Sequence, residues 1–83
     1  MAKLRITFNT RGEESPSVVI STDLSKEQIK DTVVSKLAVS QSVSFPNNRN
    51  TAVYTVLKDN VKEVIVSDTT QISALKLEDI TFN

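Results

Sequence analysis

One segment of the chain has a clear helical pattern, and the runs on both sides of it have the composition of β-strands. In residues 24–38, Ser25 and Gln28 have the spacing of a capping box, in which each side chain accepts a hydrogen bond from the other residue's backbone N–H. The apolar side chains of this segment recur one turn apart, at Ile29, Val33 and Leu37. The segment is therefore predicted to form a one-sided helix of about 12–14 residues that packs against a sheet.

The segments around this helix predict strands, because they alternate apolar and polar residues or are rich in β-branched side chains. These runs are residues 3–9, 17–22, 51–58, 61–67 and 76–82. The first two are expected to form one hairpin and the next two a second hairpin. Residues 39–50 are expected to be irregular, because Pro46 and the following Asn-rich turn oppose regular structure. Val43 and Phe45 are expected to fold back toward the core.

The order of these elements predicts a single α+β domain over residues 1–83, in ββαβββ order. One helix would pack on a mostly antiparallel sheet of four or five strands. A hairpin, one helix, a long loop and further strands resemble the β-grasp arrangement of ubiquitin-like proteins. The chain ends in "ITFN" without the C-terminal Gly-Gly of ubiquitin-like modifiers, so the resemblance does not imply conjugation. A plain ββαββ sandwich fits the same pattern.

The predicted second hairpin carries apolar residues on both of its faces. A three-residue turn would place two apolar pairs opposite each other on the helix side, Val56–Val64 and Tyr54–Val66. The other face would then carry Val53, Thr55, Leu57 and Ile65, with Val19 as a further candidate. The cover of this face is the chain's own loop 39–50 or C-terminal segment, strong sheet curvature, or another protein chain. These four hairpin residues are the candidate partner-binding site, and an unpaired strand edge is a second route to association.

The residue types exclude most catalytic and cofactor chemistry. The chain has no His and no Cys, so the commonest general base and the commonest metal ligands are missing. The adjacent carboxylates Glu13–Glu14 and Glu78–Asp79 point apart in strands or turns and do not make a metal site. Gly12 is the only glycine, which excludes a glycine-rich phosphate loop. We expect no enzyme activity, no cofactor and no metal.

Nucleic-acid binding is a weak alternative. Ten cationic and ten anionic side chains give a formal net charge of zero, whereas nucleic-acid coats need a strong positive field. Lys3, Arg5 and Arg11 could line the outer face of the first hairpin as a nucleic-acid-binding side. The four aromatic residues have apolar neighbours and are expected in the core, not on an exposed stacking surface.

These observations favour a small non-enzymatic protein–protein interaction domain that binds a partner, or itself, through its sheet. The composition resembles that of a phage or mobile-element accessory protein, which could bind and inhibit a host protein. The alternatives are a structural virion accessory protein or self-associating oligomer subunit, and the weak nucleic-acid-binding module. No apolar signal segment or membrane-spanning run is present, so a cytoplasmic location in a bacterial or host cell is expected, and a virion location is compatible.

Overall fold

The helix and most of the strands lie where the local sequence pattern predicted them. The computed structural model describes residues 2–12 and 14–83, so Glu13 of the predicted carboxylate pair lies outside the described residues. In chain order the strands and the helix are β1 (Ala2–Thr10), β2 (Ser17–Thr22), α1 (Lys26–Ala38), β3 (Ser42–Pro46), β4 (Val53–Leu57), β5 (Val61–Asp68) and β6 (Thr81–Phe82). Two short 3₁₀ turns, η1 (Lys58–Asn60) and η2 (Leu77–Asp79), precede β5 and β6. The α+β class is confirmed, and the element order follows the prediction with one strand added.

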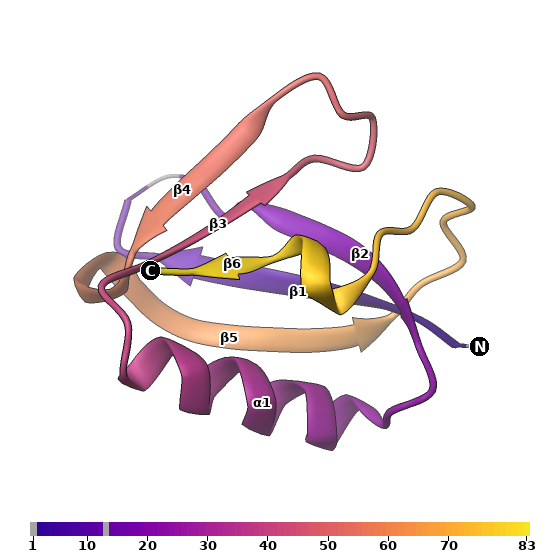
Figure 1. The fold of residues 1–83 in the computed structure, drawn as a ribbon, viewed down its shortest axis with the longest axis horizontal. Helices are drawn as coiled ribbons and strands as arrows, with labels where there is room; N and C mark the ends of the chain where they lie inside the picture. The colour runs from indigo at the N-terminus through magenta and orange to yellow at the C-terminus, as the bar shows by residue number, and fades with distance from the viewer. Residues whose placement is uncertain (1, 13) are drawn as a thin grey trace.

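The strands form two three-stranded antiparallel sheets instead of one sheet of four or five strands. The first sheet has the order β2-β1-β5 and the second has the order β4-β3-β6. Figure 1 shows α1 along one side of the molecule next to β5, and β4 along the opposite side. The β-grasp resemblance is not confirmed, because among residues 2–12 and 14–83 no strand pairing joins the two sheets into one.

The helix begins where the sequence predicted. The backbone N–H of Gln28 donates to Ser25 Oγ at 3.2 Å, and the Ser25 N–H donates to Gln28 Oε1 at 2.9 Å. This reciprocal capping box satisfies two N–H groups that the first turn cannot pair internally. The predicted apolar stripe is the buried face of the helix: Ile29, Val33 and Leu37.

The segment predicted to be irregular contains a strand. Residues 42–46 form β3, the central strand of the second sheet, and Val43 and Phe45 are buried as expected. Pro46 is tolerated because it is the last residue of β3, and its ring nitrogen lies on the side away from β4, past the end of β6. The irregular prediction was wrong because Pro46 ends this strand instead of preventing it.

The predicted second hairpin is also wrong. β4 pairs with β3 and β5 pairs with β1, so Val56 lies opposite Val43 and Tyr54 opposite Phe45. The turn η1 carries the chain from one sheet to the other instead of closing a hairpin. Val56 of β4 and Val64 and Val66 of β5 face the core from different sheets. The apolar residues of the other parity are exposed: Val53, Leu57 and Ile65.

The core lies between the two sheets and α1. Phe8 of β1 stacks on Phe45 of β3 with ring centroids 5.3 Å apart, and this contact joins the inner faces of the two sheets. The Tyr54 ring also contacts Phe45, with ring centroids 5.9 Å apart, but Tyr54 is 39% exposed and is not part of the buried core to which the sequence assigned it. Val64 and Val66 of β5 are partly buried against the same core. Within the described residues, no helix is long and apolar enough to cross a membrane.

Candidate functional site

The outer edge of β2 is covered by the chain itself. The side-chain amide of Asn48 accepts from the Val19 N–H and donates to the Val19 carbonyl, both at 2.9 Å. Leu75 also donates its N–H to the Val19 carbonyl and accepts from the Ser21 N–H, both at 2.9 Å. An amide side chain and a parallel bridge thus take the place of a neighbouring strand. Val19, a further candidate for the exposed face, is consequently fully buried.

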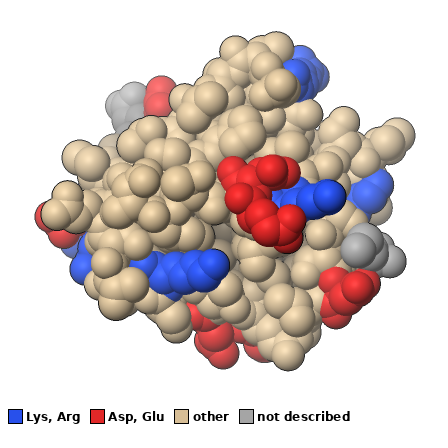
Figure 2. Space-filling view, in the orientation of Figure 1, with Lys and Arg blue, Asp and Glu red and all other residues tan. Residues whose placement is uncertain are grey.

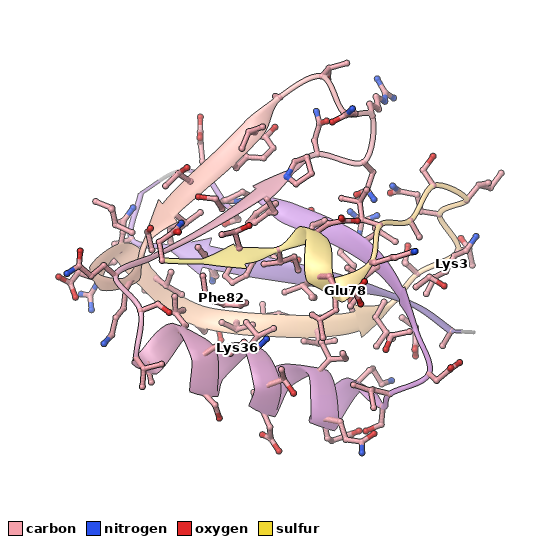
Figure 3. All side chains as sticks on the ribbon, in the orientation of Figure 1. Lys3, Lys36, Glu78 and Phe82 are labelled. Atoms are coloured by element: carbon pink, nitrogen blue, oxygen red, sulfur yellow. The ribbon has the colours of Figure 1, made fainter. Side chains whose placement is uncertain are left out.

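The outer edges of β5 and β6 are obstructed in other ways. The helix α1 flanks β5, and Lys26 Nζ lies 2.8 Å from Asp68 Oδ2 at the end of that strand. This hydrogen bond raises the pKa of Lys26, although both side chains are too exposed for the pair to stabilise the fold strongly. The strand β6 has only two residues, and Lys36 Nζ lies 5.7 Å from the centre of its Phe82 ring (Figure 3). Charge and short length are common protections of sheet edges.

The outer edge of β4 is open. Two backbone hydrogen bonds flank the pairing of β4 with β3: the Lys58 N–H donates to the Gln41 carbonyl, and the Asn47 N–H donates to the Ala52 carbonyl. Their positions show which residues of β4 direct their backbone groups toward β3. Because antiparallel pairing alternates, Tyr54 and Val56 point their backbone groups toward β3. The residues that alternate with them point their backbone N–H and carbonyl groups away from β3: Val53, Thr55 and Leu57. Within residues 2–12 and 14–83, these outward groups have no backbone partner.

The same three residues carry exposed, uncharged side chains. They share one face of the second sheet with their register partners on β3, which are Pro46, Ser44 and Ser42. Val53 is 70% exposed and Leu57 is 63% exposed, while Thr55 Oγ1 hydrogen-bonds Ser44 Oγ at 3.0 Å. Figure 2 shows a mostly uncharged surface over β3 and β4. We name Val53, Thr55 and Leu57, with their outward backbone groups, the β4 edge.

The fourth predicted partner-binding residue lies elsewhere. Ile65 is on β5, opposite Thr7 of β1, on the outer face of the first sheet. It is 43% exposed, but it does not share a sheet with Val53, Thr55 and Leu57. The single strip predicted from the sequence is therefore divided into the β4 edge and a separate residue, because β4 and β5 do not pair. Loop 39–50, one of the covers considered for this face, instead supplies β3 and the Asn48 amide.

Two of the three candidate nucleic-acid-binding cations bind groups of the protein itself. Lys3 Nζ donates to the Ile72 carbonyl at 2.8 Å, and Figure 3 shows Lys3 beside the loop that follows β5. Arg5 donates to Gln71 Oε1 at 3.0 Å and to Ser17 Oγ at 3.3 Å. Arg11 lies exposed just after β1. Two of these cations thus hold Gln71 and Ile72 against the first sheet, instead of forming a continuous cationic face.

The surface beside β4 has hollows. One of about 250 Å³ lies between β4 and the turn after β1, and its lining includes Thr10, Glu14, Pro16 and Asn60. Among the described residues, no group of three or more Asp, Glu, His or Cys side chains is placed to hold a metal ion. The carboxylate of Asp79, from the other predicted pair, accepts a hydrogen bond from the Lys76 N–H and caps η2. A strand edge beside a shallow hollow with a mixed polar and apolar lining is suited to binding another chain.

Comparison of the chain with protein-family models, with curated proteins and with solved structures found no match. The functional argument therefore depends on the geometry of the β4 edge. The pairing of β4 with β3 was missed from the sequence, but one signal pointed to its open edge. No charged residue occurs between Arg49 and Lys58, so the strand lacks the charges that commonly protect an edge.

Proposed function

We propose that this protein is a protein–protein interaction domain without enzymatic activity, and that it binds its partner by strand addition at the β4 edge. The observation that carries this proposal is the unpaired backbone of Val53, Thr55 and Leu57 beside exposed apolar side chains. In strand addition, the backbone hydrogen bonds supply affinity and alternate side chains supply specificity. Val53 and Leu57 would be the two apolar contacts, separated by the polar Thr55.

The contrast with the other edges supports this choice of site. β2 is covered by Asn48 and Leu75, β5 is flanked by α1, and β6 is two residues long. Proteins commonly protect exposed edges because unpaired strands recruit other chains. An edge left uncharged and apolar, in a fold that protects its other edges, is therefore expected to have a binding partner.

The finer functional predictions rest on sequence composition. A phage or mobile-element accessory protein that inhibits a host protein would use the β4 edge to occlude a surface of its target. A virion subunit would use the same edge for assembly, and the cytoplasmic and virion locations correspond to these two roles. Nucleic-acid binding is the weaker alternative, because Lys3 and Arg5 already bond to the loop that follows β5.

Leu57→Asp is expected to abolish partner binding without unfolding the protein. Leu57 is exposed, so the new carboxylate stays hydrated in the free chain but would be desolvated beneath an added strand. The measurement is capture by the immobilised chain from an extract of its source cells, followed by mass spectrometry. A partner retained by the wild type should be lost, by at least about tenfold, with the variant.

Ile65→Asp is the matched control, because Ile65 is an exposed apolar strand residue on the other sheet. The sequence alone placed Leu57 and Ile65 in one candidate partner-binding site, whereas the structure places them on different sheets. Retention with Ile65→Asp and loss with Leu57→Asp supports the β4 edge. Loss with Ile65→Asp alone would move the site to the first sheet, and unfolding of Leu57→Asp in circular dichroism would show that Leu57 belongs to the core.

A further inference from the structure

We propose that the strand added at the β4 edge is β4 of a second copy of this chain, in an antiparallel pair about a two-fold axis at Thr55. This inference rests on the proposed function and names the partner. The axis would place Thr55 opposite its own copy, and Val53 opposite Leu57 of the copy. All outward backbone groups of these residues would then gain partners, because each would donate and accept one hydrogen bond across the axis.

The side chains of β4 are complementary to themselves in this register. Val53 and Leu57 are both apolar and exposed, so the antiparallel pair buries an aliphatic side chain against another aliphatic side chain at each end. The central Thr–Thr pair is a favourable cross-strand neighbour. No charged residue lies in Val53–Leu57, so no like charges meet across the axis. A shift of two residues would place Val53 opposite Thr55 and leave Leu57 without an apolar partner.

The fold also explains why such pairing would stop at two copies. Joining β4 to its copy makes one six-stranded sheet from two three-stranded sheets, with the strand order β6-β3-β4-β4-β3-β6. The ends of that sheet are two-residue strands, which offer little backbone for further addition. An isologous contact about a two-fold axis uses each β4 edge once and is closed. The expected assembly is therefore a dimer and not a fibre.

Cysteine cross-linking tests both the partner and the register, because the chain contains no native cysteine. In an antiparallel hydrogen-bonded pair the opposed Cα atoms are about 5.5 Å apart, within the range that a disulfide spans. Thr55→Cys should therefore form a disulfide dimer under mild oxidation at least about tenfold faster than Val53→Cys. Val53→Cys faces Leu57 of the copy, so it should form a disulfide rapidly only when mixed with Leu57→Cys. Sedimentation velocity of the wild type should show a concentration-dependent dimer.

Two outcomes would overturn this inference. One is a wild-type chain that stays monomeric at millimolar concentration, and the other is equal cross-linking of Thr55→Cys and Val53→Cys alone. In either case, capture of a different protein that Leu57→Asp abolishes would leave the proposed function intact with that protein as the partner. Monomeric behaviour together with the absence of any Leu57-dependent capture would end both proposals.

Discussion

Replacing Phe45 with alanine is expected to lower the free energy of unfolding by about 3–5 kcal/mol. Phe45 is 1% exposed and contacts the rings of Phe8 and Tyr54, so its removal leaves a cavity where the two sheets meet. The loss is a large share of the roughly 5–15 kcal/mol that stabilises a domain. Urea denaturation followed by circular dichroism measures it, and the variant should unfold at a clearly lower urea concentration.

Phe82→Ala is the matched control for this substitution. Phe82 is also a strand phenylalanine of the second sheet, but it lies only partly buried on the two-residue strand β6. The cost of truncating an aromatic side chain depends on how completely it is buried, so this control should lose less stability. A loss at Phe45 equal to or smaller than the loss at Phe82 would contradict the two-sheet core described above.

The parts of the fold that depend on neighbouring residues could be predicted from the sequence. The helix α1 is specified by residues close together in the sequence: the capping box of Ser25 and Gln28 and the apolar stripe that begins at Ile29. The first hairpin also follows from local alternation, and it pairs Ile6 with Val18. Regular periodicity within a short stretch of chain leaves few alternatives for such elements.

The partners of β4 and β5 could not be predicted in the same way. Pairing between strands is a contact between distant segments, and β4 and β5 adjoin in sequence without pairing in space. The sequence therefore placed Val56 opposite Val64 in one hairpin, whereas these two residues face the core from different sheets. The strand β3 was missed because Pro46 and the turn after it weighed against regular structure.

The candidate site was partly predictable for the same reason. Val53, Thr55 and Leu57 were grouped correctly, because alternate residues of one strand lie on the same face. Ile65 was added to them only through the incorrect hairpin register. The unpaired backbone that distinguishes the β4 edge could not be predicted from the sequence. Its prediction requires the knowledge that β3 pairs with one side of β4 and that nothing in the described chain pairs with the other side.

Replacing Thr55 with proline is expected to weaken association at the β4 edge by at least tenfold while leaving the fold intact. Thr55 directs its N–H away from β3, so its loss breaks no backbone bond within the part of the chain that the structure describes. Proline is tolerated at such positions of edge strands, but it removes the donor that an added strand needs. Sedimentation velocity and partner capture measure the loss of association, and urea denaturation measures the stability.

Tyr54→Pro is the control, because it removes an N–H that points toward β3 from the adjacent residue of the same strand. It should lower the free energy of unfolding by about 1–3 kcal/mol, since the opposing carbonyl of the buried Phe45 loses its partner. A Thr55→Pro variant that is destabilised as strongly as Tyr54→Pro would show that the Thr55 N–H has a partner within the fold. Unchanged association of a folded Thr55→Pro variant would show that strand addition does not occur at this edge.

Amide hydrogen exchange along β4 tests most directly whether this edge is open in the free chain and closed by association. In dilute solution the outward amides of Val53, Thr55 and Leu57 should exchange rapidly, while those of Tyr54 and Val56 are protected by β3. On dimerisation or partner binding, the outward amides should slow by at least about a hundredfold, with little change at the inward ones. Outward amides that are already slow in dilute solution, or that stay fast in the associated state, would contradict a binding edge at β4.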